Sequence, residues 1–181
     1  MFGMKLILVR HAKAKERDAK RFPDDSQRPL SANGRREFVK FARRIPRWLE
    51  APSLVLASGW TRAWDTADIL HSQSKWPAAK RCEALETEGG FAAVEVLLQL
   101  LAKYQNEKYV AVVGHEPVLS ELISRLMGAS ERAIDFAKGA VAVVEITNAQ
   151  PLRGELHSLV SPSTALNRLK KSRGLDRRNR K

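Results

Sequence analysis

The amino-acid sequence predicts an α/β fold: a three-layer α/β/α sandwich with a mostly parallel central sheet and an antiparallel edge. Short apolar runs rich in β-branched residues, at 6–9 and 109–113, are typical of strands buried on both faces. Between such runs lie longer segments whose apolar residues recur at helical spacing. The last two apolar runs, 140–146 and 152–160, flank a turn sequence ending in Pro151, which favours a terminal hairpin.

The predicted elements follow one another in the order of an open α/β sheet. We expect strands over residues 6–9, 53–57, 109–113, 140–146 and 152–160, with a possible short edge strand within 77–83. We expect helices over residues 32–45, 62–71, 91–101 and 118–127. Ser31 can cap the first of these helices and Pro46 ends or kinks it, while Pro117 suits the first turn of the last helix.

The length of 181 residues suits one domain and a terminal extension. We expect a domain over residues 1–163 and a basic tail over residues 164–181. The net charge of +12 is uneven, since residues 167–181 hold eight basic residues and one acidic residue, a net +7. Such a block is either a solvated segment or a contact for polyanions such as nucleic acid or polyphosphate. The sequence leaves the oligomeric state open.

Two features of the composition favour a cytoplasmic protein. No segment approaches about 18 consecutive apolar residues, so we expect no membrane span, and the apolar run within residues 1–9 is too short for a signal peptide. Cys82 is the only cysteine, which excludes an internal disulfide and a cysteine-based zinc site. A reducing compartment fits this cysteine usage.

Two of the predicted strands end beside a histidine. The first strand is followed at once by Arg10 and His11, and the strand at 109–113 ends just before Gly114 and His115. Ligands of open α/β sheets bind at the carboxyl ends of strands, so we expect both imidazoles at one edge of the sheet. The helix that begins after His115 favours an anion at its N-terminus.

These residues belong to four motifs spread along the chain. The motifs are Arg10-His11, Arg28-Pro29-Leu30-Ser31-Ala32-Asn33-Gly34, Ser58-Gly59-Trp60-Thr61-Arg62-Ala63-Trp64-Asp65-Thr66-Ala67 and Gly114-His115-Glu116-Pro117. In this order they closely resemble the histidine phosphatase superfamily, and within it the short, SixA-type phosphohistidine phosphatases. The resemblance covers roughly residues 4–160 and implies a phosphoglycerate-mutase-like fold. One departure is Ala12, which stands where the superfamily signature has glycine.

The resemblance also implies roles for the matching positions. His11 is then the nucleophile, and His115 is a catalytic residue that also binds the phosphate. Arg10 and Arg62 are expected to be catalytic and, together with Arg28, to bind the phosphate. The chemistry agrees, because guanidinium N–H forks match phosphate oxygens and a neutral imidazole can attack phosphorus. We expect no cofactor and no metal, since no Gly-rich phosphate loop or carboxylate cluster indicates magnesium.

A general acid would protonate the leaving group of a phosphate ester. In larger members of the superfamily a carboxylate from one of two regions does so, and Glu86 and Glu116 resemble these two regions. Each has an ordinary alternative: Glu86 as a solvated loop residue, and Glu116 as a carboxylate favoured by a helix N-terminus. Both stay candidates for catalysis on the sequence alone.

The leading hypothesis is a cytoplasmic hydrolase that removes phosphate from phosphohistidine on a protein, through a covalent phosphohistidine intermediate. Its partner would be a phosphorylated signalling protein, for instance a histidine-phosphotransfer domain. One alternative is a broader phosphomonoesterase that acts on small phosphoesters. Another is a non-catalytic module whose pocket and basic tail bind polyanions.

Overall fold

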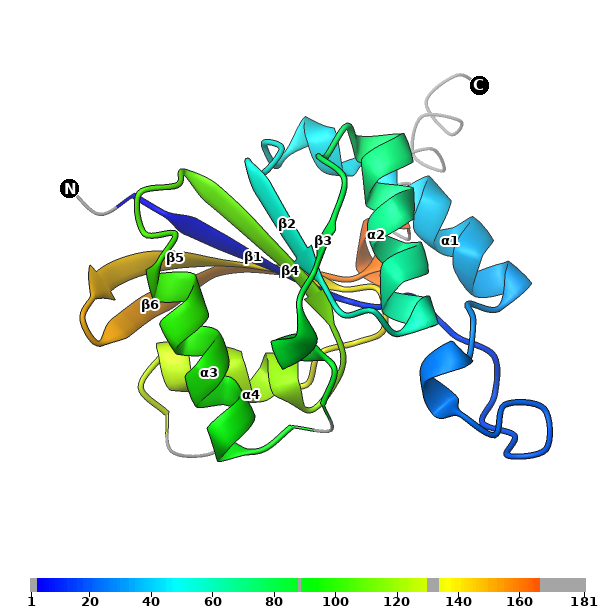
Figure 1. Ribbon diagram of the computed structural model, residues 1–181. Coiled ribbons are helices and arrows are strands. Elements are labelled where there is room, and N and C mark those ends of the chain that lie inside the picture. Colours follow the sequence, from blue (N-terminus) through cyan, green and yellow to red (C-terminus); the bar gives the residue numbers. More distant parts are fainter. Residues whose placement is uncertain (1–2, 88, 130–133, 167–181) are drawn as a thin grey trace, which may run out of the picture.

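The computed structural model describes residues 3–87, 89–129 and 134–166, which form a sandwich built on one six-stranded sheet (Figure 1). The strand order is β3-β2-β4-β1-β5-β6. The strands are β1 Lys5–Arg10, β2 Leu54–Ala57, β3 Lys80–Arg81, β4 Tyr109–Gly114, β5 Val141–Ala149 and β6 Leu152–Val160. The first four run parallel to one another, whereas β5 pairs antiparallel with both β1 and β6. The predicted fold class is therefore confirmed, including its antiparallel edge.

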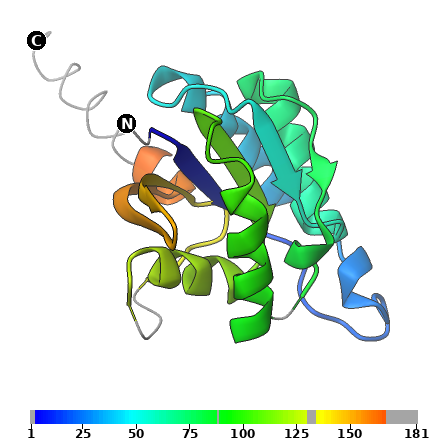
Figure 2. The same ribbon diagram turned by 60° about the vertical axis from the view of Figure 1, so that its left-hand side comes forward.

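Two pairs of helices cover the two faces of the sheet (Figures 1 and 2). The helices are α1 Ala32–Ala42, α2 Thr61–Ser74, α3 Phe91–Ala102 and α4 Val118–Leu126, joined by the short 3-10 helices η1 Asp25–Gln27, η2 Ile45–Arg47 and η3 Glu83–Leu85. Alternate residues of each strand point to opposite faces, so Ile7 and Val9 pack with α1 and α2, while Leu6 and Leu8 pack with α3 and α4. Burial on both faces explains why these strands are continuously apolar.

The ends of two helices differ from the sequence prediction. Helix α1 ends at Ala42, and Ile45 belongs to η2 instead. Helix α2 continues past His71 to Ser74, whose hydroxyl donates a 2.8 Å hydrogen bond to the carbonyl of Ala42. Since this bond joins two helices, the local sequence pattern held no sign of it.

The described chain ends in a helical turn over residues 162–166. The rest of the predicted basic tail, from residue 167 on, lies outside the described residues, and the boundary at residue 163 stays a prediction. None of the helices within residues 3–87, 89–129 and 134–166 is long and apolar enough to cross a membrane.

Candidate active site

The structure brings the two predicted histidines together. Strands β1 and β4 are parallel neighbours, and Arg10 of β1 pairs with Gly114 of β4. The residues that follow these two, His11 and His115, therefore lie side by side. The backbone N–H of His11 donates a 3.0 Å hydrogen bond to the carbonyl of Gly114. The centroids of the two imidazole rings lie 5.2 Å apart, and both side chains are buried.

Both rings open into a cavity of about 550 Å³ at the carboxyl end of the parallel strands. Its wall includes six of the seven predicted site residues: Arg10, His11, Arg28, Arg62, His115 and Glu116. Other residues of the wall are Lys15, Glu16, Arg17, Trp60, Thr87, Pro117 and Lys138. The excess of cations makes this cavity suited to an anion. Among the described residues, no group of three or more His, Cys, Asp or Glu side chains is placed to hold a metal ion.

The tautomer of His11 follows from its hydrogen bond. Its Nδ1 lies 2.7 Å from the carbonyl oxygen of Ala12, and a carbonyl can only accept. The proton of the neutral ring is therefore on Nδ1, which leaves the lone pair on Nε2 available for attack. The N–H of Ala12 in turn donates to the Thr66 hydroxyl at 3.0 Å, which ties this segment to α2.

Both imidazoles are held in the neutral form. Burial is the main reason why the pKa of His11 is lowered to about 3; the bond to Ala12 opposes it, and the charges of Arg62 and Arg10 act in the same direction as burial. Burial, followed by the charges of His11 and Arg62, lowers the pKa of His115 to about 2. A neutral ring at pH 7 is the form that a nucleophilic histidine needs.

A buried serine orients the second histidine. The Nε2 atom of His115 lies 2.8 Å from the Oγ of Ser58, which accepts a 3.3 Å hydrogen bond from the backbone N–H of Trp60. The Ser58 hydroxyl can then donate to Nε2, which places the ring proton on Nδ1. That Nδ1 atom is buried and has no hydrogen-bond partner among the described residues. It is thus the atom of His115 that is available as a donor to a bound anion.

Arg62 and Arg28 share one carboxylate, that of Asp25. An Nη2 of Arg62 lies 3.0 Å from Oδ2 of Asp25, and the Nε of Arg28 lies 2.8 Å from Oδ1. Arg62 also donates from Nη1 to the Asp25 carbonyl at 2.7 Å, and Arg28 donates to the Lys15 carbonyl at 2.6 Å. The hydrogen bond from Arg28 is the main reason why the pKa of Asp25 lies below its ordinary value. Asp25 therefore fixes the orientation of the Arg28 and Arg62 guanidinium groups, although it is absent from the cavity wall.

Arg10, Arg62 and Trp60 make further contacts in the cavity wall. Arg10 donates from Nη1 to the carbonyl of Phe136. The Arg62 side chain is 4% exposed and stacks on the ring of Trp60 at 4.7 Å, and the same ring lies 4.5 Å from that of His115. A buried cation in the first turn of a helix is locally unfavourable. Its position is explained by the Asp25 carboxylate on one side and the anion-binding cavity on the other.

The two predicted acids differ in position. Glu116 lies in the cavity wall, and its Oε2 accepts a hydrogen bond from the Ser120 hydroxyl. Glu86 is not part of that wall. Both of its oxygens are bound by Arg81, at 2.6 and 2.7 Å, and Oε1 also accepts from the N–H of Gly59 at 3.0 Å. The bond to Arg81 is the largest cause of the lowered pKa of Glu86, which makes this carboxyl a poor proton donor.

Three site residues were not singled out from the sequence. Asp25 carries a usable signal, since it is an acid on a short helical turn, three residues before an arginine that is predicted to bind phosphate. Ser58 ends the predicted second strand, but its contact with His115 depends on the pairing of β2 with β4. Lys138 is 127 positions from His11 in the sequence, and no local pattern indicates that it lies in the same cavity wall.

Comparison with known proteins agrees with this geometry. A family model, the histidine phosphatase superfamily (branch 1), matches residues 6–91. The fold is similar to that of the protein histidine phosphatase SixA complexed with tungstate, at 26% identity and a TM-score of 0.75, over 88% of this chain and 98% of that one. None of the curated protein sequences compared with the chain matches it significantly.

Two further solved structures share the fold. One is described as the phosphohistidine phosphatase SixA from Agrobacterium tumefaciens, with 21% identity, a TM-score of 0.72 and coverage of 90% of this chain and 100% of that one. The other is the alpha-ribazole phosphatase from Shigella flexneri, with 21% identity, a TM-score of 0.70 and coverage of 88% and 97%. The same fold thus occurs in enzymes described with different substrates.

Proposed function

Because this chain belongs to the histidine phosphatase superfamily, we propose that it hydrolyses phosphohistidine on a protein through a phosphohistidine formed on His11. The single observation that supports this most strongly is the state of His11. Its proton is on Nδ1, its pKa is about 3, and its ring lines a cavity whose wall includes Arg10, Arg28 and Arg62. An imidazole in that state is a nucleophile at neutral pH.

The first step is phosphoryl transfer to the enzyme. The Nε2 lone pair of His11 forms a bond to phosphorus as the bond from phosphorus to the substrate imidazole breaks. Arg10, Arg28 and Arg62 and the Nδ1–H of His115 hold the three equatorial oxygens. The substrate ring is protonated by solvent on its other nitrogen, because an imidazole takes up a proton near pH 6.5, and it then leaves as neutral imidazole.

The second step is hydrolysis of the intermediate. Water attacks phosphorus in line, the bond from phosphorus to Nε2 of His11 breaks, and inorganic phosphate forms. The proton of the attacking water goes to the departing Nε2 and then to solvent, because the low pKa of His11 restores the neutral ring. The same cations serve both steps, so these residues can complete a turnover by themselves.

The leaving group favours a phosphoramidate over an ester. An alkoxide must be protonated as it leaves, and a general acid typically contributes about 10²- to 10⁴-fold to that step. Glu86 is bound by Arg81 outside the cavity, which leaves Glu116 as the one carboxyl among the predicted acids that lines it. An imidazole leaving group needs no such acid.

The short loop over the site favours a protein substrate. The segment between β1 and α1 is closed by a bridge between Ala14 and Leu30, and only the short η1 lies within it (Figure 1). A small sugar phosphate needs many enclosing contacts. A phosphate displayed on a protein surface needs only the arginines and histidines. The comparison with SixA supports this proposal, since that protein histidine phosphatase is complexed with tungstate, a tetrahedral oxyanion.

We place the reaction in the cytoplasm, in a phosphorylation-based signalling pathway whose phosphoprotein is the substrate. The buried free thiol of Cys82 is compatible with a reducing compartment. A non-catalytic polyanion-binding module is a weaker proposal, because the cavity presents a positioned nucleophile and not only a basic surface.

The test compares the wild-type chain with His11→Ala on a phosphorylated histidine-phosphotransfer domain, on free phosphohistidine and on para-nitrophenyl phosphate. The wild type is expected to release phosphate from the first two substrates and to form a phosphoenzyme that is labile to acid and stable to base. The His11→Ala protein should do neither. Equal phosphate release by the two proteins would contradict the proposal.

A broader phosphomonoesterase is the second candidate, and the position of Glu116 in the cavity favours it. If Glu116 is the acid for ester substrates, Glu116→Gln should lower kcat about a hundredfold on an ester with an alkoxide leaving group, such as glycerol phosphate, and change kcat on phosphohistidine by less than about threefold. Equal effects on both substrates would exclude Glu116 as a proton donor.

A further inference from the structure

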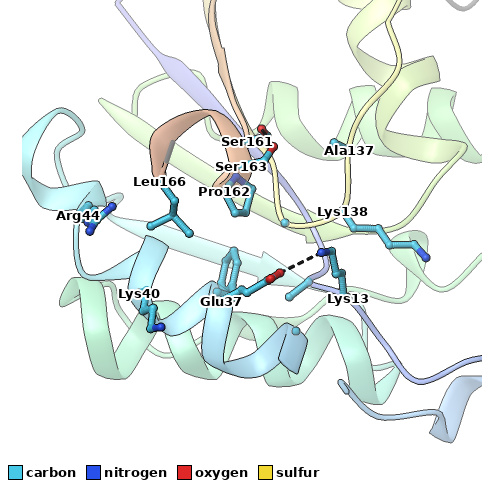
Figure 3. Close-up of a pocket in the computed structure, with 14 residues that line it drawn as sticks. Lys13, Glu37, Lys40, Arg44, Ala137, Lys138, Ser161, Pro162, Ser163 and Leu166 are labelled. Atoms are coloured by element: carbon cyan, nitrogen blue, oxygen red, sulfur yellow. Dashed lines mark hydrogen bonds and ion pairs between the residues drawn. The ribbon is translucent and has the colours of Figure 1, made fainter. Parts of the chain in front are cut away.

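A second cavity, of about 820 Å³, lies next to the catalytic one and takes no part in the chemistry described above (Figure 3). Its walls come from α1, from the loop over residues 137–139 and from residues 161–166. Lys138 belongs to the walls of both cavities. Ala12 and Lys13, which directly follow the nucleophile His11, also line it. We call this second cavity the groove. A ligand that fills the groove therefore lies beside the molecule that presents a phosphate to His11.

The groove combines an apolar floor with a basic rim. Pro162 and Leu166 supply apolar surface, whereas the ring of Phe38 is buried. In Figure 3, Lys13 and Lys138 stand at one end of the groove, and Arg44 stands at the other.

The rim, which consists of the charged residues of this wall, carries a net positive charge. Its basic residues are Lys13, Lys40, Arg44 and Lys138, and its one acid is Glu37, so four cations and one anion leave a net +3. The acid is already neutralised, because Nζ of Lys13 lies 3.0 Å from the Glu37 carboxylate. The pKa of Glu37 is lowered chiefly by its hydrogen bond from Lys13 and less by the charge of Lys40, so two of the four cations act on the one acid of this wall.

We propose that this groove binds an acidic, partly apolar segment of the phosphoprotein substrate, next to its phosphohistidine. The inference rests on the proposed function and names the part of the substrate that lies outside the phosphate site. Charge complementarity selects acidic side chains for the rim, and the floor selects aliphatic ones. Because Lys138 lies in the walls of both cavities, we place the acidic and the aliphatic side chains on the same polypeptide as the phosphohistidine.

Other occupants fit the groove less well. The chain's own residues 167–181 carry a net +7, the same sign as the rim, so charge opposes their binding there. A single-stranded nucleic acid needs exposed aromatic rings for stacking, and the one ring in this wall, that of Phe38, is 1% exposed. Free phosphate would not use the apolar floor.

Two synthetic peptides of equal length and one central histidine test the proposal. One carries Asp, Glu and Leu around the histidine, and in the other every acid is replaced by lysine. Fluorescence anisotropy measures binding of the unphosphorylated, labelled peptides, so this measurement does not depend on catalysis. The acidic peptide should bind at least about tenfold more tightly than the basic one, with a difference that shrinks as salt is raised. Equal binding of the two peptides would overturn the proposal.

The kinetic arm uses the same peptides, phosphorylated on histidine, and free phosphohistidine. The groove variant Lys40→Glu/Arg44→Glu should lower kcat/KM for the acidic phosphopeptide at least about tenfold and leave that for free phosphohistidine within about twofold. Lys80→Glu/Lys103→Glu is the matched control, because these exposed lysines line neither cavity and the charge change is the same. Lys40→Glu alone, at an exposed position, gives a smaller effect in the same direction if the double variant does not fold.

The outcomes separate the two proposals. Loss of the acidic-peptide preference in the groove variant alone supports the groove, and an equal loss in the matched control overturns it. If wild type binds the acidic peptide but hydrolyses none of the phosphohistidine substrates, the proposed function fails while the groove as an acidic-peptide site stands. If wild type hydrolyses free phosphohistidine and shows no peptide preference, the proposed function stands and the groove proposal is overturned.

Discussion

Two buried, neutral histidines in one cavity make the stability of this fold sensitive to mild acid. Folding lowers the pKa of His11 to about 3 and that of His115 to about 2, whereas an unfolded chain has histidines near 6.5. Below pH 6.5 the unfolded state therefore binds more protons than the native state. The free energy of unfolding then falls as the pH falls, and the window runs from about 6.5 down to the native pKa values.

The magnitude follows from the linkage relation. Between pH 7 and pH 5 a histidine that stays neutral when folded and titrates at 6.5 when unfolded lowers the free energy of unfolding by about 1.9 kcal/mol. Two such groups give about 4 kcal/mol, a large share of the stability of about 5–15 kcal/mol that is typical of domains. The carboxyl groups with lowered pKa, such as Asp25 and Glu37, lose their stabilising charge mainly below pH 5, outside this interval.

Urea unfolding at pH 7 and pH 5, in a buffer without phosphate or other tetrahedral anions, measures this loss. The double variant His11→Asn/His115→Asn removes both titrating groups and serves as the comparison. We expect wild type to lose about 4 kcal/mol more than the variant between the two pH values. If the two proteins lose the same free energy within about 1 kcal/mol, the histidines are not held neutral by the fold, and the argument for a neutral nucleophile fails with them.

Three substitutions test the positioning of the site. Asp25→Asn should lower kcat about tenfold, because Arg28 and Arg62 lose their shared carboxylate, whereas Asp24→Asn removes a charge but keeps an oxygen that can cap η1, and should leave kcat within about twofold. Ser58→Ala should lower kcat/KM about tenfold and shift the ¹⁵N signals of the His115 ring toward a mixture of tautomers; unchanged signals would remove Ser58 from the site. Glu86→Gln should keep kcat/KM within about threefold on phosphohistidine and on glycerol phosphate, and a hundredfold loss on the ester alone would make Glu86 the general acid after all.

The parts of the fold that the sequence predicted best are those decided by local pattern. The strands Lys5–Arg10 and Tyr109–Gly114 are short apolar runs bounded by polar residues. Such a run is typical of a strand that is buried on both faces of a sheet. The end of α2 was missed because Lys75, not a glycine, takes the left-handed conformation with φ of 60° there. Because glycine is the usual residue at such a helix end, the composition around Lys75 did not indicate it.

The candidate site residues also differ in whether a local pattern predicts them or their role depends on a contact partner. His11, His115 and Arg62 could be predicted because each stands at the end of a strand or the start of a helix, where an open sheet collects its ligand-binding residues. Glu86 also follows a short helical turn, but Arg81, five residues earlier on β3, binds both carboxylate oxygens. Whether a carboxyl is available for proton transfer depends on such partners, and a single sequence does not show them.

In the proposed mechanism, the cations of the cavity serve the nucleophile as well as the phosphate. Burial lowers the pKa of His11 most, but the charges of Arg62, Arg10 and Lys138 add to it, so the residues that attract the anion also keep the ring deprotonated before it arrives. A bound dianion offsets those charges and raises the pKa of both imidazoles, which strengthens the Nδ1–H of His115 as a donor to the phosphate. For His11 the same rise is prevented once Nε2 is bonded to phosphorus, since the lone pair is no longer free to accept a proton. Asp25 limits the excess charge by pairing with two of the arginines, which lets the cavity hold its guanidiniums close together without the phosphate.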